Sequence, residues 1–324
     1  MIISKTPFRM SFVGGGSDLR SFYKDIPGGV ISASIDKYIY LSIHKYFHPD
    51  RSLLKYSKTE EVNSIDQIEH NIIREVFRFY NIKNVDFNST ADIPSGTGMG
   101  SSSAFTVGLI NLCSHYNGKI LPNYEIAKLA CEIEIEILKE PIGKQDQYGC
   151  AIGGLKYIRF NPDETVEVNP IFLSNDKLLQ LQNNLLLFYT NSVRSASSIL
   201  SEQNKNTQRN KSVKDNLKSM SKMSSQLFLE LNKGNIDLVG TYLNEAWQRK
   251  KRMTSLISNP EIDHIYDIAI KNGAMGGKLL GAGGGGFFLF YVPLQNQEKL
   301  RKSLKSYIEL PFNFDFDGTK IIYN

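Results

Sequence analysis

The sequence predicts an α+β protein with two domains, and two observations carry this prediction. Short apolar runs of period two, typical of strands, alternate with stripes of apolar residues at helical spacing. The chain has 324 residues and becomes more polar near residues 174–176, whereas single domains commonly hold roughly 100–200 residues. We therefore expect an N-terminal domain at 1–174 and a C-terminal domain at 175–324.

Strands and helices are expected to be interleaved in the first half of the chain. Apolar runs between turn residues predict strands at 1–4, 10–13, 30–47, 84–93, 150–160 and 165–173. Apolar stripes and long apolar runs predict helices at 66–79, 103–115 and 123–139. The last of these helices is expected to end before Pro141, because proline interrupts helical hydrogen bonding.

The second half is expected to form helices packed against one short sheet, which is an α+β layer arrangement. The expected elements are a strand at 185–190, helical segments within 193–235, a helix at 236–258, a strand after a glycine-rich loop within 276–292, a helix at 297–308 and a terminal strand at 312–324.

The composition disfavours several classes of protein. The 38 Lys and Arg residues exceed the 33 Asp and Glu residues by five, a bias far below the dense basic surface of a nucleic-acid-binding protein. No apolar run approaches the roughly 18–20 residues of a membrane span. Three cysteines, Cys113, Cys131 and Cys150, form no CxxC pair, and so sparse a set is typical of a reducing compartment. We expect a cytoplasmic protein that binds neither nucleic acid nor membrane, with its oligomeric state left open.

The strongest local signal is the loop at 94–104, which has the sequence PSGTGMGSSSA. Its glycines leave backbone N–H groups bare, and the expected helix after it would turn its positive end toward a bound anion. A flexible linker is the alternative, although a strand before the loop and an apolar helix after it favour a phosphate site. The predicted nucleotide-binding residues are Pro94, Gly96, Gly98, Met99, Gly100, Ser101, Ser102 and Ser103.

Three motifs, in order, resemble those of the GHMP kinases, the family of galacto-, homoserine, mevalonate and phosphomevalonate kinases. The loop at 94–104 resembles the central motif, KTPFRMSFVGGGSD at 5–18 resembles the N-terminal motif, and KLLGAGGGG at 278–286 resembles the C-terminal motif. The resemblance implies an N-terminal domain similar to domain 2 of ribosomal protein S5, a ferredoxin-like C-terminal domain, and an active site between them. It also implies ATP and Mg²⁺ as cofactors.

The resemblance also implies catalytic roles for residues that match the motifs. A Glu on a helix and a Ser of the loop hold Mg²⁺ in the family, which assigns Glu134 and Ser101 as metal ligands; a solvated acidic helix face is the alternative for Glu134. Asp146 is assigned as the base that accepts the substrate proton. Arg9 and Lys5 of the N-terminal motif complete the catalytic set, with a structural ion pair and simple exposure as their respective alternatives.

Substrate contacts are expected from both halves of the chain. The resemblance aligns Asp18 with a residue that accepts sugar hydroxyls, while galactokinase carries Glu and His where this chain has two glycines, so galactose is disfavoured. Arg194 follows an expected strand in a loop of small residues, which suits a bidentate contact to a phosphate. The charge run at 249–252 is either a solvated face or part of the same phosphate site. The predicted substrate-binding residues are Gly15, Gly16, Ser17, Asp18, Arg194, Gly283 and Gly284.

Four segments of the second half, at 191–197, 248–252, 258–263 and 276–286, resemble one branch of the family, the D-glycero-D-manno-heptose 7-phosphate kinases. That branch implies phosphorylation of the anomeric C1 hydroxyl of a heptose that already bears a 7-phosphate, on the route to a GDP-activated heptose for surface polysaccharide. The alternatives are a sugar kinase of the fucose or galactose type, a non-catalytic sugar or nucleotide sensor on the same fold, and an RNA-binding protein. A sensor is disfavoured because it has no need of Arg9, Glu134 and Asp146 together.

Overall fold

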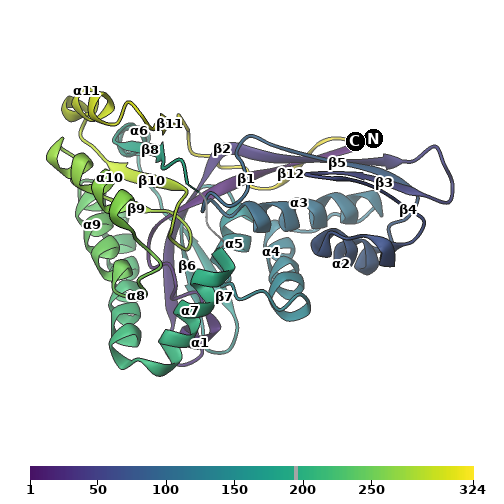
Figure 1. Cartoon of the computed structure of the whole chain (residues 1–324), viewed down its shortest axis with the longest axis horizontal. Coiled ribbons are helices and arrows are strands. Elements are labelled where there is room, and N and C mark those ends of the chain that lie inside the picture. The colour runs from purple at the N-terminus through teal and green to yellow at the C-terminus, as the bar shows by residue number, and fades with distance from the viewer. Residues whose placement is uncertain (193–195) are drawn as a thin grey trace.

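The computed structural model describes residues 1–192 and 196–324, and it has the expected α+β architecture (Figure 1). The larger of its two sheets contains β1 (Ile2–Val13), β2 (Gly28–Lys45), β3 (Ser52–Lys55), β4 (Thr59–Val62), β5 (Val85–Ala91), β6 (Leu155–Phe160), β7 (Val166–Pro170) and β12 (Lys320–Tyr323). Their order is β12-β1-β2-β5-β3-β4, with β6 pairing with both β2 and β7. The smaller sheet contains β8 (Leu185–Tyr189), β9 (Gly276–Leu279), β10 (Phe287–Tyr291) and β11 (Ile308–Glu309), in the order β11-β8-β10-β9.

Strand β1 is one continuous strand, where the sequence predicted two short runs separated by Pro7. Its pairing with β2 shifts register at this point, from Pro7 opposite Tyr38 to Phe8 opposite Ile35. A bulge of this kind accommodates a proline, which has no N–H to donate to its neighbour. Because the strand continues, Arg9 lies in the middle of the sheet rather than in a turn.

The helices of the first half are α1 (Arg20–Tyr23), α2 (Asn71–Tyr80), α3 (Ser101–Tyr116), α4 (Asn123–Cys131) and α5 (Gln145–Ala151), with the short segments η1 (Ile65–Gln67) and η2 (Glu132–Ile137). Helix α3 packs against β1 and β2 (Figure 1), and it is buried on every side from Ser103 to Ser114. This burial explains its nearly uniform apolar sequence.

Two predicted elements of the first half are different in the structure. The helix expected at 123–139 divides into α4 and the π-helical η2, whose Glu134 is buried. The strand expected at 150–160 begins only at Leu155, because Cys150 and Ala151 complete α5. Gly154, with a φ of 84°, forms the turn between them.

The helices of the second half are α6 (Asn175–Asn183), α7 (Ala196–Arg209), α8 (Lys211–Asn232), α9 (Leu238–Lys251), α10 (Pro260–Lys271) and α11 (Leu294–Ser303). Helices α6 and α10 were not predicted, and α9 ends earlier than expected. The predicted strand within 276–292 is two antiparallel strands, β9 and β10, joined by the glycine loop. That loop is thereby held at one end of the small sheet.

The two halves are connected through the large sheet. The end of the chain returns to it, since β12 pairs antiparallel with β1 (Figure 1). Helix α8 also packs against β1 and β2, and helix α9 packs against β1. The division at 174/175 stays a prediction, and the last strand of the second half belongs to the sheet of the first.

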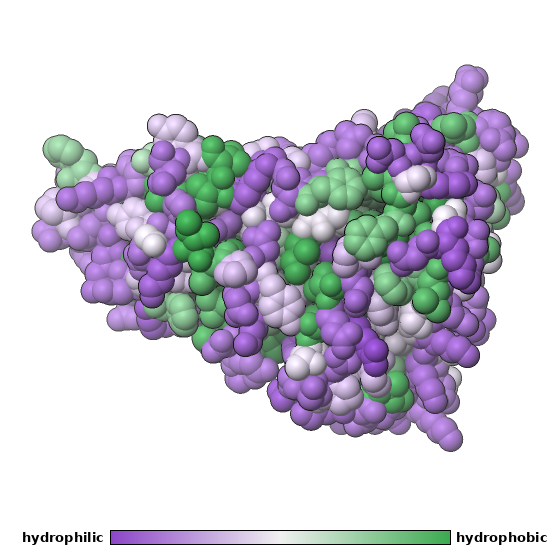
Figure 2. All heavy atoms as spheres, turned by 180° about the vertical axis from the view of Figure 1, so that it is seen from behind, coloured by the Kyte–Doolittle hydropathy of each residue, from purple (hydrophilic) through white to green (hydrophobic). Residues whose placement is uncertain are grey.

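The surface carries mixed polarity. Figure 2 shows hydrophilic residues over most of the rear face, with hydrophobic side chains among them in separate groups. Within residues 1–192 and 196–324, no helix combines the length and the hydropathy that a membrane crossing needs.

Candidate active site between the glycine loops

A cavity of about 860 Å³ lies where the three glycine-containing motifs meet. Its walls come from the end of β1, the loop before α3, the start of α5 and the loop between β9 and β10. Residues more than 250 positions apart in the chain, such as Gly16 and Gly283, line the same cavity. The fold therefore brings the three motifs to one place.

The loop before α3 adopts the conformation that its glycines permit. Gly96, Gly98 and Gly100 have φ values of 76°, 80° and 77°, which residues other than glycine rarely adopt. A Cβ on Gly98 would lie 2.5 Å from the carbonyl oxygen of Leu280, so the first glycine loop touches the second. The loop ends at the N-terminus of the 16-residue helix α3, a favourable place for an anion.

The predicted nucleotide-binding residues are placed unequally. Seven of them line the cavity: Pro94, Gly96, Gly98, Gly100, Ser101, Ser102 and Ser103. Met99 is fully buried instead, and its carbonyl oxygen accepts a hydrogen bond of 3.1 Å from the backbone N–H of Arg9. Met99 thus fixes the loop to β1.

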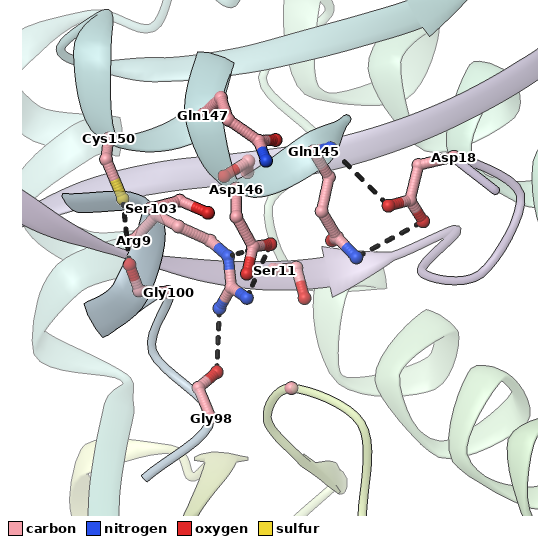
Figure 3. Close-up of polar contacts among 12 residues, drawn as sticks. Arg9, Ser11, Asp18, Gly98, Gly100, Ser103, Gln145, Asp146, Gln147 and Cys150 are labelled. Carbon is pink, nitrogen blue, oxygen red and sulfur yellow. Dashed lines mark hydrogen bonds and ion pairs between the residues drawn. The ribbon is translucent and has the colours of Figure 1, made fainter. Parts of the chain in front are cut away.

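Arg9 and Asp146 form an ion pair in the wall of the cavity (Figure 3). Arg9 donates from Nε at 2.9 Å and from Nη2 at 2.7 Å to the same oxygen, Oδ1 of Asp146. Its Nη1 donates at 2.7 Å to the carbonyl oxygen of Gly98. Although burial opposes its charge, the Asp146 carboxylate raises the pKa of Arg9 above the usual value. Arg9 therefore stays charged and connects the base candidate to the phosphate loop.

A second carboxylate, Asp18, lies on the neighbouring wall (Figure 3). Its Oδ1 accepts from the backbone N–H of Gly16 at 2.8 Å and from Nε2 of Gln145 at 3.2 Å. Burial raises its pKa, and the nearby Asp146 raises it further. Gly15 and Gly16 also line the cavity, whereas Ser17 is buried and donates to the carbonyl oxygen of Gly14 at 2.8 Å. Ser17 thus stabilises the turn that places Gly15, Gly16 and Asp18 at the cavity wall.

Glu134 is buried behind the serines of the loop. Its two carboxylate oxygens accept hydrogen bonds of 2.6–3.2 Å from Ser102, Ser103, Thr106 and Gln147. Burial nevertheless raises its pKa to about 7, because removal from water disfavours the charged form more than these donors favour it. Ser101 lines the cavity but is not a partner of Glu134.

The oxygen atoms beside the phosphate loop can be compared with the ligands that a magnesium ion prefers. Mg²⁺ prefers hard oxygen ligands and is commonly held by one or two carboxylates together with substrate phosphates. A single carboxylate beside serine hydroxyls at a phosphate loop matches that preference. The described part of the chain has no group of three or more His, Cys, Asp or Glu residues able to hold a metal by themselves. The oxygen donors are of the type that Mg²⁺ prefers; Glu134 itself lies outside the cavity lining with both oxygens accepting hydrogen bonds, so it would ligate an ion only after releasing Ser102 or Ser103.

Of the remaining predicted site residues, some line the cavity and others do not. Gly283 lines the cavity, while Gly284 does not and donates its backbone N–H to the carbonyl oxygen of Ile257 at 2.9 Å. Lys5 lies outside the cavity lining, with Nζ 3.9 Å from the ring centre of Tyr38. Arg194 lies outside the described residues.

Many residues of the cavity lining were not singled out in the sequence, including the following four polar ones. Ser11 and Gln145 adjoin predicted positions in β1 and α5, and Gln203 and Lys250 come from α7 and α9. Lys250 belongs to the charge run at 249–252, which the sequence left open between a solvated face and a phosphate site, and nothing in the run marks Lys250 as its buried member. Gln203 lies in a mostly polar helix, and the composition of that helix does not distinguish its inward-facing polar side chains from its exposed ones.

One arm of the cavity is lined by aromatic and apolar side chains. The ring of His70 stacks on Phe105 with centres 5.1 Å apart, and Tyr56 meets His70 edge-on at 4.9 Å. Burial lowers the pKa of His70, which favours the neutral ring. A flat, uncharged group could pack in this arm beside the phosphate loop.

Comparison with known proteins gives the family. Two family models match: GHMP kinases N terminal domain at 67–154 and GHMP kinases C terminal at 227–310. A D-glycero-alpha-D-manno-heptose 7-phosphate kinase of Campylobacter jejuni is 30% identical, with 98% of each chain covered. A galactokinase of Pyrococcus furiosus is 25% identical, over 88% of this chain and 87% of its own.

Solved structures agree with the sequence comparisons. The structure of a D-glycero-D-manno-heptose 1-phosphate kinase from Bacteroides thetaiotaomicron has a TM-score of 0.81 and 27% identity, and each chain is covered completely. The resemblance inferred from the three motifs is thereby confirmed. The chain belongs to the GHMP kinase family, as a sugar kinase that transfers a phosphoryl group from ATP to an alcohol.

Proposed function

We propose that this kinase phosphorylates the C1 hydroxyl of D-glycero-D-manno-heptose 7-phosphate and forms the 1,7-bisphosphate, a precursor of GDP-heptose for surface polysaccharide. The observation that carries the reaction type is the Arg9–Asp146 pair, which lies between the phosphate loop and the Asp18 wall. The heptose is supported by relatives that are named heptose phosphate kinases. Gly15 also supports it, since a Cβ there would meet no atom closer than 3.8 Å, which leaves space at the cavity wall.

Asp146 is the proposed base. Arg9 engages Oδ1 twice, and no described residue donates to Oδ2, which leaves one oxygen for the sugar hydroxyl. The hydroxyl oxygen bonds to the γ-phosphorus of ATP as the bond from that phosphorus to the β,γ-bridging oxygen breaks. The hydroxyl proton passes to Asp146, and ADP leaves.

The nucleotide is proposed to bind along the first glycine loop. Backbone N–H groups at 96–103 and the N-terminus of α3 would bind its phosphates, and the base would enter the arm between Tyr56 and Phe105. Ser101 and Glu134 would hold Mg²⁺, which neutralises charge on the phosphates when it is bound.

The sugar is proposed to lie between the two domains' glycine loops. Asp18 and the glycines at 15–16 face it from one side, and Gly283 faces it from the other. Arg194 remains the proposed partner of the 7-phosphate on the sequence argument alone. We place the reaction in the cytoplasm, where ATP is made and where buried thiols such as Cys150 stay reduced.

The test is a panel of acceptors assayed by ADP release, with NMR of the phosphorylated product. Heptose 7-phosphate should exceed free heptose, galactose and fucose in kcat/KM, because a fixed distal phosphate contributes binding energy that positions C1. The product should carry phosphate at C1. Equal turnover of free hexoses would contradict the heptose proposal, and binding without turnover of any sugar would favour a sensor.

A further inference from the structure

Lys250 is a buried cation in the cavity wall that the proposed reaction has not yet used. It lies on α9, its side chain is 4% exposed, and it lines the cavity. Its sequence neighbours behave as surface residues: Arg249 pairs with Glu245 at 2.8 Å, and Lys251 pairs with Asp263 at 3.1 Å. One residue of this charge run has therefore been directed inward.

Lys250 and Arg9 hold the two glycine loops from opposite domains. Arg9 donates to the carbonyl oxygen of Gly98, and Lys250 donates to the carbonyl oxygen of Gly281. These loops touch, since a Cβ on Gly281 would lie 2.4 Å from the Cα of Gly98. The two cations thus flank the contact between the loops, at the edge where the phosphates are proposed to end.

Lys250 is short of hydrogen-bond acceptors in this position. An ammonium group has three N–H donors, and among the described residues Gly281 is the one acceptor within reach. Burial lowers the pKa of Lys250 to about 8, and the charge of Arg9 lowers it further, while Asp18 and Asp146 oppose this. Lys278 is buried in the same neighbourhood, where its Nζ donates to the carbonyl oxygen of Ser11, and burial together with the charges of Lys250 and Arg9 lowers its pKa. A buried ammonium with free donors is suited to an anion that enters the cavity.

We propose that Lys250 is a catalytic residue that contacts the γ-phosphate of ATP and follows that phosphoryl group to the sugar. This inference rests on the proposed kinase reaction. Charge builds on the equatorial oxygens of the phosphoryl group during transfer, so a cation fixed from the second domain stabilises the transition state more than the ground state. Because Lys250 comes from α9 in the second half of the chain, this contact also makes catalysis depend on the position of α9 at the cavity. Neither role was visible in the sequence.

The matched pair of variants is Lys250→Met and Lys251→Met, which remove adjacent charges with the same side chain. Loss of one donor to a developing charge typically costs about 100–1000-fold in kcat. We expect that loss in Lys250→Met, with KM for the sugar changed by less than about 3-fold, and near wild-type turnover in Lys251→Met. ATP affinity should fall in Lys250→Met while ADP affinity is retained, because ADP lacks the contacted group. Retained ADP affinity also shows that the variant is folded.

Two outcomes would overturn the inference. Turnover of Lys250→Met equal to that of Lys251→Met removes the catalytic role, and loss of sugar-phosphate affinity alone assigns Lys250 to the sugar's own phosphate. An inactive wild-type enzyme would instead contradict the proposed function, so the two failures are distinguishable.

A measurement on the wild-type protein covers the case in which Lys250→Met does not fold. Acetic anhydride acetylates accessible amines, and mass spectrometry reports the fraction modified at Lys250. A non-hydrolysable ATP analogue should protect Lys250 at least about 5-fold better than ADP does, with Lys251 as the internal control. Equal protection by the two nucleotides would overturn the γ-phosphate contact.

Discussion

Arg9 places two N–H groups on one oxygen of Asp146, at 2.9 and 2.7 Å, and leaves the other oxygen without a donor among the described residues. A bidentate fork onto both oxygens would have occupied the whole carboxylate. The arrangement instead fixes the orientation of Asp146 through Oδ1, while Oδ2 stays open to the cavity. Oδ1 thus fixes how Asp146 is oriented, and Oδ2 remains available to accept a hydrogen bond or a proton.

Asp146→Asn should abolish most turnover without abolishing binding. The amide keeps the size of the carboxyl but cannot accept the hydroxyl proton, and general base catalysis is typically worth about 10²–10⁴ in rate. We expect a kcat loss in that range, with dissociation constants for ATP and sugar within about 3-fold of wild type. Calorimetry and steady-state kinetics measure both quantities. Near-normal kcat would show that the transition state needs no proton acceptor here.

Lys5→Met should leave catalysis nearly intact. The sequence resemblance assigned Lys5 to the catalytic set, yet its ammonium lies over the ring of Tyr38 and outside the cavity lining. A cation over an exposed ring contributes about 0.5–1 kcal/mol, so a small loss of stability is the expected effect. The measurement is kcat/KM beside the melting temperature. A loss of kcat above about 10-fold would return Lys5 to the site.

Gly98→Ala and Gly118→Ala separate backbone strain from function. Both glycines have positive φ, 80° and 72°, so either alanine should cost about 1–2 kcal/mol of stability. At Gly98 the new Cβ would also lie 2.5 Å from the Leu280 carbonyl oxygen, whereas no atom lies within 4 Å at Gly118. We expect ATP affinity to fall at least about 10-fold in Gly98→Ala alone. Equal ATP affinity in the two variants would exclude the loop as the phosphate site.

Glu134→Gln should become relatively more stable as the pH rises. The folded-state pKa of Glu134 is about 7 against an ordinary 4.5, so its contribution to stability is present below pH 4.5 and is lost as the pH rises through 7. The amide does not titrate. Between pH 5 and pH 8, without Mg²⁺, the stability difference between variant and wild type should change in the variant's favour by up to about 3 kcal/mol.

The exposed neighbour Glu132 provides the control for this experiment. Glu132→Gln should show no such pH-dependent difference in denaturant titrations. If Glu134 ligates Mg²⁺, saturating Mg²⁺ and nucleotide should also reduce the difference, since a bound cation favours the carboxylate. A difference that is independent of both pH and Mg²⁺ would contradict the buried, titrating carboxylate.

The sequence predicted the conformation of the glycine loop at 94–104 better than the elements around it. Three glycines before an apolar helix leave few conformations, and all three have positive φ in the structure. Strand β1 was divided at Pro7 because local preference for a turn is visible in a sequence, whereas the bulge that absorbs the proline depends on β2. Helix α5 was missed because it is short and its apolar residues continue into the following strand.

The site was predictable only where a residue belongs to a motif. Arg9 and Asp146 were both assigned to the catalytic set through the family motifs, and they lie in contact in the structure. Lys250 and Gln203 face the cavity because of how α9 and α7 pack on the first domain, and helical periodicity cannot reveal an inward polar residue among polar neighbours. Long-range packing thus decides which polar residues reach the cavity.

Gln203 supplies the last prediction, which concerns sugar recognition. Its side chain is 2% exposed and lines the cavity, and its Nε2 has no hydrogen-bond partner among the described residues. That nitrogen lies over Gly16, where a Cβ would be 2.2 Å away. At the adjacent Gly15, where a Cβ would lie 3.8 Å from the Gln145 amide, Oε1 of Gln145 is likewise without a partner among the described residues, while its Nε2 donates to Asp18. Leaving a buried amide unpaired costs free energy, which a bound sugar hydroxyl would recover.

Gln203→Met keeps an unbranched side chain of similar length and removes the amide. A neutral hydrogen bond is worth about 0.5–1.5 kcal/mol, so KM for the sugar should rise about 3- to 10-fold while KM for ATP stays unchanged. Gln208→Met, at an exposed position of the same helix, should change neither constant. Deoxy sugars identify the hydroxyl that Gln203 contacts. Wild type should bind the sugar better than the analogue that lacks this hydroxyl, and Gln203→Met should bind the two equally well. If every deoxy analogue is discriminated equally by wild type and variant, Gln203 does not contact the sugar, and its amide is a structural group of α7.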